Sequence, residues 1–549
     1  MLTGITLPNP SHKGRGYSYS YSYGYGYGYG YGYGYSSKYR TNRIMILLLL
    51  IIIPLIGGLA AWIFGRDNNA SARWISLAAL TLDCVLLLTL WSDSSLQPML
   101  DQGKWLVEWN RAWIPQLGIG FHLAMDGLSL VLTALTLFLG IISVVCSWTE
   151  IKDRVGFFHL NLLWILAGIL GVFLALDLFL FYFFWELMLV PMYFLINIWG
   201  HENRVYASLK FFIFTQAGGL FMLLSILALY FIHGRTSGIY TFDYTLLLGT
   251  ALPPQAAFWI MAGFLIAFIV KLPVVPFHPW LPDAHTEAPT AGSVILAGLL
   301  LKTGAYGLLR FVLPLFPNAA ASIAPLMLLL AVIGIIYGAL LAFSQSDLKR
   351  LIAYTSVSHM GFVLLGIFSG TQTALSGSVM QMLAHGISTG ALFIIAGMIQ
   401  ERVHTRDINR MGGLWTSAPR LGSVGLVFAL ASLGLPGFGN FVAEFMILIG
   451  SFRSHGIITT LAASGLVLAA IYSLWIVQRV FHGNTDKGLQ QPSDLTLREA
   501  GMMAVMIVTI IWIGILPRPV LKPVESVLQS ISHTTMQAIH AGEANHDRR

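Results

Sequence analysis

Residues 256–273 read AAFWIMAGFLIAFIVKLP, an apolar run of membrane-helix character that ends at Lys271 and Pro273. Residues 293–309 read SVILAGLLLKTGAYGLL, a second apolar run with Lys302 near its middle. On insertion scales an ionisable side chain costs roughly 2.5–3.5 kcal/mol at the bilayer centre, so each lysine requires a partner or a use. The two runs therefore indicate a membrane fold and a functional site inside it.

The composition agrees with a membrane fold over most of the chain. Of 549 residues, 56% are hydrophobic and 10% are charged, and the mean hydropathy is +0.73. A soluble domain is about 25% charged. Since a helix spans a bilayer with about 20 apolar residues, and strand-like alternation is absent, we expect an all-α polytopic membrane protein.

The apolar runs predict about fourteen transmembrane helices. They cover approximately residues 45–64, 73–91, 124–147, 158–176, 179–199, 206–232, 255–272, 290–313, 323–343, 348–368, 374–398, 420–450, 458–480 and 500–516. Lys and Arg gather in alternate loops, beginning with Arg66 and Arg73. Residues 346–350, SDLKR, predict a helix start and an inside anchor in one of these loops. The positive-inside rule places the first loop in the cytoplasm and both termini on the periplasmic side, so the net charge of +7 does not indicate nucleic acid binding.

Two of the predicted spans are interrupted. The seventh meets Lys271-Leu-Pro273-Val-Val-Pro276, and the twelfth contains SLGLPGFGN at residues 432–440. Proline and glycine free backbone groups that protein or water must satisfy at membrane depth. Because the breaks lie five spans apart, an odd number, we expect two inverted five-helix repeats, each containing a broken helix.

The repeats define the expected organisation of the chain. The first repeat, helices 4–8, covers residues 158–313, and the second, helices 9–13, covers residues 323–480. Residues 45–147 hold the first three helices, and residues 500–549 hold the last helix and a C-terminal tail.

Residues 1–44 do not share this pattern, because residues 17–35 alternate Tyr with Ser or Gly. Such low-complexity sequence is typical of disordered segments. We expect an extension upstream of a functional start at Met45. A genuine disordered tail and a targeting segment are the alternatives, although the Arg-rich amphipathic pattern of transit peptides is missing.

Glu186 stands near the middle of the fifth predicted span, with no cation in its own helix. Lys271 and Lys302 are the nearest candidate partners in the sequence. A Glu and a Lys that interact in a low dielectric titrate as a pair, which is the behaviour that a proton pump needs. The alternatives are a static buried ion pair and, for Lys271, snorkelling to the membrane interface.

Three further ionisable residues lie in the second half. Glu444 follows the second break by about two turns and is a candidate terminal proton donor or acceptor. His359 and His385 stand in the tenth and eleventh spans, and histidine can pass a proton from one ring nitrogen to the other. The alternative for each is a structural side chain, hydrogen-bonded in the core.

The loop at residues 276–290 contains two histidines and two acids: His278, Asp283, His285 and Glu287. Their spacing fits no zinc motif, and a re-entry loop whose polar groups cap the flanking helices is favoured. Cys84 and Cys146 stand far apart in apolar runs and read as small buried hydrophobes. With no dinucleotide fingerprint and no P-loop, we expect no metal or cofactor in this chain, so any redox chemistry lies in another chain.

Four long motifs resemble one known family: FWELMLVPMYFLI at residues 184–196, the run from Val270 to Arg310, SDLKRLIAYTSVSHMGFVLLG at residues 346–366, and SLGLPGFGNFVAEF at residues 432–445. They resemble the antiporter-like subunits of proton-pumping NADH:quinone oxidoreductase, the respiratory complex I. The resemblance covers residues 45–516. The likeness is strongest to the branch that ends shortly after the fourteenth span and carries an acid, here Glu444, where other branches have lysine.

The resemblance implies roles for six residues. Glu186 and Lys271 resemble the coupled pair of a first half-channel, and Lys302 resembles the central relay. His359 and His385 resemble polar members of the axis in the second half, and Glu444 resembles its terminal residue.

The resemblance also implies a proton-translocating subunit without a redox centre, driven by quinone reduction in neighbouring subunits. NADH, FMN, iron–sulfur clusters and quinone would belong to those other subunits. The expected partners are the other membrane-arm subunits, especially the neighbouring antiporter-like ones, and the lipid of a bacterial inner membrane. The alternatives are a subunit of a multisubunit sodium/proton antiporter, the membrane arm of an energy-converting hydrogenase, and a scaffold whose buried charges are only structural.

Overall fold

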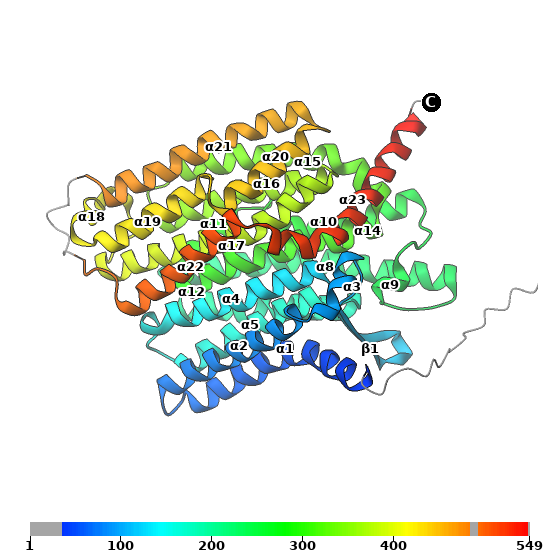
Figure 1. Cartoon of the computed structure of the whole chain (residues 1–549), viewed down its shortest axis with the longest axis horizontal. Coiled ribbons are helices and arrows are strands. Elements are labelled where there is room, and N and C mark those ends of the chain that lie inside the picture. Colours follow the sequence, from blue (N-terminus) through cyan, green and yellow to red (C-terminus); the bar gives the residue numbers. More distant parts are fainter. Residues whose placement is uncertain (1–35, 484–491, 547–549) are drawn as a thin grey trace, which may run out of the picture. The chain divides into compact units, whose positions relative to one another are not determined.

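The computed structural model describes residues 36–483 and 492–546. Residues 1–41 and 42–549 form two separate units, and the membrane helices belong to the second unit. Within that unit the long helices lie side by side and run along one common direction or its reverse (Figure 1). The predicted extension lies mostly outside the described residues, although helix α1 (Ser36–Phe64) begins before Met45.

Thirteen helices of the described residues are long and apolar enough to cross a membrane. The first six are Arg43–Phe64 of α1, α2 (Asn69–Trp91), α4 (Gly127–Glu150), α5 (Val155–Leu174), the pair α6 (Leu178–Leu187) and α7 (Leu189–Trp199), and α8 (Arg204–Ser237). The other seven are α10 (Pro254–Lys271), the segment Thr290–Leu315, α15 (Pro317–Phe343), α16 (Leu348–Phe368), α17 (Gln372–Val403), Gly456–Phe481 with α21 (Gly456–Ile476), and α22 (Leu497–Ile515). The predicted twelfth span is a pair of shorter apolar helices, α19 (Pro419–Ser432) and α20 (Gly439–Phe452), and it completes the fourteen.

Both predicted helix breaks are present. Helix α10 ends at Lys271, and the short helix α11 (Trp280–Glu287) follows a proline-containing link. Between α19 and α20, Gly434 and Gly437 adopt φ values of +77° and +102°, which glycine accepts at little cost. Figure 1 shows α11 and α20 displaced from α10 and α19 toward opposite ends of the molecule. The two broken helices thus run in opposite directions, as an inverted repeat requires, and the repeat itself stays a prediction.

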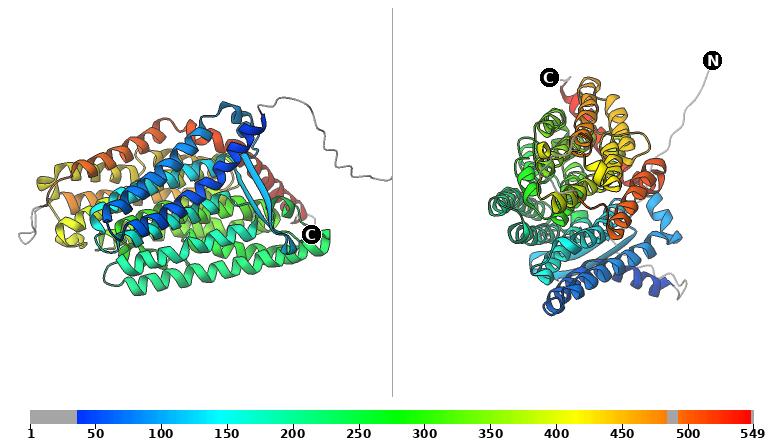
Figure 2. Two further views of the ribbon diagram at one scale, coloured as in Figure 1. Left: turned by 90° about the horizontal axis from the view of Figure 1, so that it is seen from below. Right: turned by 90° about the vertical axis from the view of Figure 1, so that its left-hand side faces the viewer.

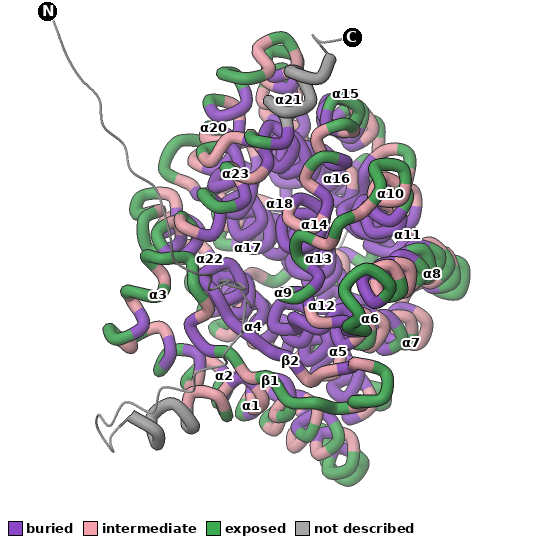
Figure 3. Tube along the Cα trace, turned by 90° about the vertical axis from the view of Figure 1, so that its right-hand side faces the viewer, coloured by how far each residue is buried: buried purple, intermediate pink, exposed green. Residues whose placement is uncertain are grey.

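The interior of the molecule is formed by the segment Thr290–Leu315 and by α17, which are buried over their whole apolar windows. On α8, by contrast, exposed side chains such as Phe221 and Leu224 are apolar, as expected of a surface that faces lipid. Figure 3 shows this contrast between the buried centre and the exposed outer helices.

The central segment Thr290–Leu315 is not a regular α-helix. Two π-helical turns, Leu296–Leu300 and Leu308–Val312, flank the α-helical residues Leu301–Gly307. Wide turns of this kind are frequent at functional sites, because they release carbonyl groups from the usual ladder. Lys302 lies two residues after the end of the first of them.

The loop between the second and third spans contains an antiparallel hairpin, which the all-helical prediction missed. Strands β1 (Val107–Ile114) and β2 (Ile119–Met125) pair with Asn110 opposite His122. The hairpin lies across one end of the helices, which we call the hairpin end (Figure 2). It was missed because two short strand segments are a weak signal beside long apolar helices.

Residues after the fourteenth span form a further helix, α23 (Arg518–His546), where a tail was expected. Its buried apolar face, which includes Val524 and Leu528, packs against α4, α15 and α17. At Gly127 of α4, a Cβ atom would lie only 1.7 Å from the Pro523 carbonyl oxygen, so this packing requires glycine.

Arg43, near the start of the first span, and the helix α23 both contact residues 95–100, so they lie at the same end of the second unit. Arg43 donates to Ser95 Oγ at 2.7 Å, and Ser526 donates to the Leu100 carbonyl in the same segment. The predicted placement of the two termini stays a prediction.

Candidate functional site

The second half of the molecule holds a buried cluster around His359 and Glu444. His359 Nδ1 lies 2.8 Å from Glu444 Oε1, and the same oxygen accepts a hydrogen bond from Gln381 Nε2 at 2.8 Å. The three side chains come from α16, α17 and α20, and all are buried. The histidine and the acid were predicted, but Gln381 was not.

The second ring nitrogen of His359 also has polar neighbours. Its Nε2 lies 3.1 Å from the Tyr472 hydroxyl and 3.3 Å from Ser432 Oγ. Ser432 is the last residue of α19, so the helix break lies beside the ring. The break also lies close to the acid, because a Cβ atom on Gly434 would be 3.3 Å from Glu444 Oε2.

Lys302 joins this cluster through His385. Its Nζ lies 2.8 Å from His385 Nδ1 and donates to the Ala297 carbonyl oxygen at 2.5 Å. Ala297 belongs to the first π-helical turn and precedes Lys302 by five residues. The ring centroids of His385 and His359 are 5.7 Å apart, so four predicted site residues form a nearly continuous line from Lys302 to Glu444.

The predicted pair of Glu186 and Lys271 is less direct. Lys271 is 1% exposed, so it does not snorkel, and its Nζ lies 5.3 Å from the ring centroids of Trp185 and Phe211. Among the described residues, Lys271 Nζ has no hydrogen-bond partner, and no ion pair within 4 Å joins it to Glu186.

Among the described residues, no carbonyl group at the helix break binds Lys271 Nζ. The Val270 carbonyl accepts from Trp280 Nε1 at 2.9 Å instead. Glu186 Oε1 faces α8, where a Cβ atom on Gly219 would lie 2.6 Å from it.

The loop at residues 276–290 distributes its polar groups among separate partners. Asp283 pairs with Lys210 at 2.6 Å, and Glu287 Oε2 accepts from the Asn203 backbone at 2.9 Å. The His285 ring stacks on Phe393 with centroids 4.7 Å apart. Within the described residues, no group of three or more His, Cys, Asp or Glu side chains could hold a metal ion.

The SDLKR motif at residues 346–350 was predicted to start a helix and to act as an inside anchor, and the structure separates its two basic side chains: that of Arg350 is 42% exposed, whereas Lys349 is buried. Asp347 does cap α16 as predicted, because its carboxylate accepts from the Arg350 backbone at 3.0 Å. Lys349, however, is fully buried, with Nζ 3.2 Å from both the Ala288 carbonyl oxygen and His201 Nε2. A lysine in a basic loop carries no sequence signal that distinguishes this position from an exposed one.

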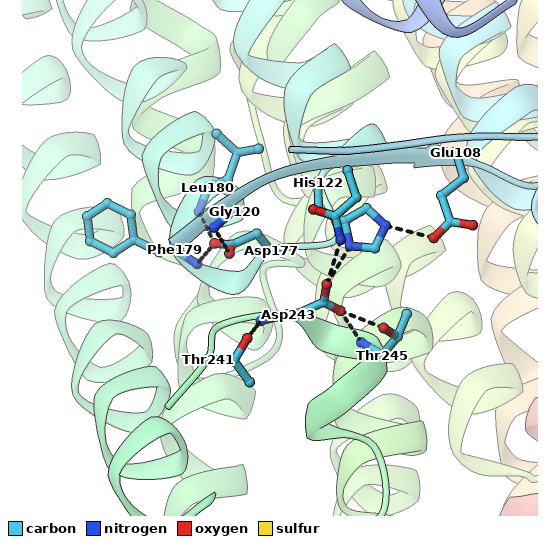
Figure 4. Close-up of polar contacts among 10 residues, drawn as sticks. Glu108, Gly120, His122, Asp177, Phe179, Leu180, Thr241, Asp243 and Thr245 are labelled. Carbon is cyan, nitrogen blue, oxygen red and sulfur yellow. Dashed lines mark hydrogen bonds and ion pairs between the residues drawn. The ribbon is translucent and has the colours of Figure 1, made fainter. Parts of the chain in front are cut away.

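A second polar cluster that the sequence did not reveal lies at the hairpin end (Figure 4). His122 on β2 is 1% exposed, with Nδ1 2.8 Å from Asp243 and Nε2 3.0 Å from Glu108. Asp177 caps α6, the helix that carries Glu186, and also accepts from the Gly120 backbone at 2.9 Å. The hairpin is thereby attached to the start of the membrane helix α6 and to the start of the short helix α9 (Tyr244–Leu247), which lies in the loop after α8.

Known proteins resemble the chain over most of its length. A family model for the transmembrane region of NADH:quinone oxidoreductase and Mrp antiporters matches residues 175–471. Subunit M of NADH-quinone oxidoreductase from Pseudomonas aeruginosa is 55% identical over 479 residues, which cover 86% of this chain and 94% of that protein. Subunit M from Escherichia coli K12 is 51% identical, over 89% of this chain and 98% of that protein.

The chain belongs to the subunit M family of NADH-quinone oxidoreductase. Solved structures agree with this membership. A chain of respiratory complex I from Thermus thermophilus matches with a TM-score of 0.80 and 30% identity, over 89% of this chain and 99% of that chain. A chain of an archaeal membrane-bound sulfane sulfur reductase matches with a TM-score of 0.75 and 26% identity, over 86% and 76%. A chain of the Mrp complex from Dietzia, at 20% identity and a TM-score of 0.78 over 91% and 99%, shares the fold.

The matched region of this subunit M family member contains all six predicted site residues and Lys349. The hairpin, with His122 and Glu108, and the helices α22 and α23 lie outside it, whereas Asp177 and Asp243 lie inside it. The region that the family model matches therefore includes the two broken helices and the central segment between them.

Proposed function

We propose that protons move through this chain along a row of buried side chains: Glu186, Lys271, Lys302, His385, His359 and Glu444. The chain is a proton-translocating membrane subunit of NADH-quinone oxidoreductase, and the proposal concerns the path inside it. The observation that carries the proposal is the line from Lys302 through His385 and His359 to Glu444.

Each step along this line transfers one proton between groups of suitable chemistry. The Lys302 ammonium gives a proton to His385, whose ring passes it toward His359, and His359 delivers it to Glu444. The 5.7 Å between the two ring centroids is too long for a direct hydrogen bond, so a ring rotation or a water completes that step. Tyr472 and Gln381 hold His359 and Glu444 in place.

Glu186 and Lys271 set the charge at the start of the row. Lys271 is buried beside aromatic rings without an acceptor among the described residues, so its charge depends strongly on the charges near it. A change in the charge of Glu186 shifts the protonation equilibrium of Lys271. A change in the charge of Lys271 in turn shifts the protonation equilibrium of Lys302. Motion of charge in the quinone region would enter the row at this pair.

The proposal assigns the redox chemistry to other subunits. NADH, FMN, the iron–sulfur clusters and quinone bind there, and this chain contributes no cofactor. Its neighbours are the other membrane-arm subunits, in particular the antiporter-like ones, and its membrane is the bacterial inner membrane. The hairpin end, where the first span begins and α23 lies, faces the periplasm, because the basic loops gather at the opposite end.

The first test is a pair of substitutions at the start of the row. Glu186→Gln or Lys271→Ala is expected to leave the assembled complex able to reduce an artificial electron acceptor but to impair quinone-linked proton pumping in membrane vesicles. The reason is that both substitutions remove a charge whose change drives the row. Unaltered pumping by an intact complex would contradict the proposal.

A sodium/proton antiporter subunit and the membrane arm of a hydrogenase are the competing functions for this fold, and the structural matches to an Mrp complex and an archaeal reductase illustrate how widely it is shared. Neighbouring genes separate these functions. Peripheral-arm subunits with cysteine clusters accompany complex I, whereas small antiporter subunits alone accompany the antiporter.

A further inference from the structure

A cavity of about 650 Å³ lies at the hairpin end of the molecule. Its walls come from the end of the segment Thr290–Leu315, the start of α15, the link between α8 and α10, and α23. Of the described residues that line it, only Asp126 and Arg310 are charged. Since the hairpin end is assigned to the periplasm, periplasmic water reaches these two side chains through the cavity.

Lys302 lies deeper on the same segment as Arg310. Eight residues separate the two, which corresponds to about 12 Å along a helix. Tyr306 stands midway between them, about one turn from each, and does not itself line the cavity. A short chain of water and hydroxyl groups past Arg310 would therefore be enough to join the cavity to the buried lysine.

The guanidinium group of Arg310 is held at this position by several contacts. Its Nη2 pairs with Asp126 Oδ2 at 2.5 Å, and its Nε donates to the Tyr306 hydroxyl at 3.2 Å. Its Cζ lies 5.1 Å from the ring centroid of Trp105, and the side chain is 6% exposed. The Tyr306 hydroxyl donates in turn to the Phe173 carbonyl oxygen at 3.0 Å. Arg310 thus lies between the cavity and the one hydroxyl group on the way to Lys302.

A proton pump needs this end of the central segment to be closed. After Lys302 has given its proton to His385, it is a neutral amine that accepts the next proton. A proton that returned to it from the periplasm would cancel one that had been released there. Because pumping raises the proton concentration in the periplasm, the tendency of protons to return increases as the gradient grows.

We propose that Arg310 prevents periplasmic protons from returning to Lys302 along the central segment. The inference rests on the proposed function, because it concerns the same lysine. A proton passes along hydrogen-bonded groups only where each group accepts one proton and releases another. A guanidinium group has five N–H donors and no acceptor, and it does not release its proton in proteins. Its positive charge also repels a hydrated proton, as arginine does in channels that admit water and exclude protons.

The alternative is a purely structural ion pair. Asp126 caps α4 by accepting from the Ser129 backbone at 2.9 Å, so its bond to Arg310 joins α4 to the central segment. The substitution Asp126→Asn separates the two roles, because asparagine still caps the helix and the guanidinium group stays in place while the ion pair is lost. A barrier predicts that Asp126→Asn holds a pH gradient. A structural ion pair predicts that it is as defective as Arg310→Gln.

The experiment uses the whole complex, reconstituted in liposomes with its NADH site outward and a pH-sensitive dye inside. Arg310→Gln is expected to pump the normal number of protons per NADH at first, before a gradient forms. It should then reach at most about half of the final pH gradient at a matched rate of NADH oxidation, because water can link the cavity to Tyr306 past the shorter, neutral side chain. Asp126→Asn is the matched control and should reach the full gradient.

A second variant keeps the test independent of folding defects. Arg310→Gln leaves Asp126 buried without its partner, which is destabilising, whereas Arg310→Gln combined with Asp126→Asn leaves no unpaired charge. The combined variant lacks the guanidinium group, so it is expected to leak as much as Arg310→Gln does. A full gradient in the combined variant would overturn the inference.

The third comparison tests the route of the leak. A pH gradient is imposed by acidifying the liposome interior, so that it does not depend on pumping, and its decay is followed with NADH and quinone present. Adding Lys302→Met to Arg310→Gln removes the group that accepts the returning proton, so the decay should slow to the rate of Lys302→Met alone. A leak that persists without Lys302 would come from a general packing defect and would contradict the inference.

The outcomes separate this inference from the function on which it rests. If Glu186→Gln impairs pumping but Arg310→Gln reaches the full gradient, or Asp126→Asn leaks equally, only the barrier fails. If Glu186→Gln also pumps normally, the proposed function fails with it.

Discussion

Among single residues, Lys302 carries the strongest argument for function over stability. Its ammonium group is fully buried, and its partners are a histidine ring and a carbonyl oxygen rather than a carboxylate. Such a group is costly in the core, and apolar replacements of buried charges are often neutral or stabilising. The chain retains it at the centre of its most deeply buried segment.

Lys302→Met is therefore expected to keep or raise the thermal stability of the complex while it abolishes relay. Because a positioned proton donor typically contributes about a hundredfold or more, pumping should fall by at least about tenfold. Vesicle pumping and thermal denaturation of the purified complex measure the two effects. Lys302→Ala is the control, since its cavity should cost about 2–5 kcal/mol. A Met variant as unstable as the Ala variant would contradict the argument.

Among the structural elements, the second helix break depends on two glycines with the same backbone requirement but different surroundings. Both have positive φ, but a Cβ atom on Gly434 would lie 3.3 Å from Glu444 Oε2, whereas one on Gly437 would meet nothing within 4 Å. Substitutions at the two positions therefore separate the effect of backbone strain from the effect of a steric contact with Glu444.

Gly434→Ala and Gly437→Ala are each expected to cost about 1–2 kcal/mol through the left-handed backbone. Only Gly434→Ala should also lower the protons pumped per NADH, because its methyl group pushes against the Glu444 carboxylate. Thermal denaturation and pumping in vesicles test both variants together. Equal pumping by the Gly434→Ala and Gly437→Ala variants would contradict a functional contact between the helix break and Glu444.

The hairpin is the other element that can be tested, because the side chains that attach it to the helices are titratable. Burial opposes charge on His122, but hydrogen bonds and attraction from Asp243 and Glu108 raise its pKa above the ordinary value of 6.5. Burial likewise disfavours the charged Asp243, yet the bonds from His122 and Thr245 lower its pKa. Asp177, the remaining acid at this site, faces the Gly120 backbone (Figure 4).

These shifts define a pH window for the attachment. The His122 contribution is complete below its ordinary pKa and is lost as pH rises through the raised folded value. The Asp243 contribution is present above its ordinary pKa of 3.8 and is lost as pH falls through the lowered one. The contacts therefore stabilise the hairpin most at mildly acidic pH.

His122→Gln is expected to weaken the hairpin by about 1.5–3 kcal/mol near pH 6, since it removes charge-assisted hydrogen bonds, and by less at pH 9. Hydrogen exchange of the β1 and β2 amides measures this local opening. Glu108→Gln is the control and should have a small effect, because that side chain is 47% exposed and screened by solvent. A His122→Gln effect that does not change with pH would contradict the electrostatic account.

In the molecule as a whole, the buried row lies between two cavities at opposite ends. One of about 690 Å³ opens among the basic loops, and the other, of about 650 Å³, lies at the hairpin end, where Asp126, Arg310 and α23 line it. Asp126 and Arg310 form a buried ion pair at 2.5 Å between α4 and the central segment. Neither cavity is lined by Lys271 or Lys302, the two lysines that interrupt the apolar runs.

The amino-acid sequence was enough to predict the fourteen spans, the two breaks and the six candidate residues of the row, because a charge, a proline or a glycine in an apolar run has a cost that can be read locally. Which of these residues meet depended on the packing of the helices. Packing brought Lys302, two histidines and Glu444 into one line. It also left Lys271 without a direct bond to Glu186, buried Lys349 and built the hairpin contacts of His122. Those outcomes bring together helices that are far apart in the chain. A side chain's partners, and hence its chemistry, are set by that packing and not by its neighbours in sequence.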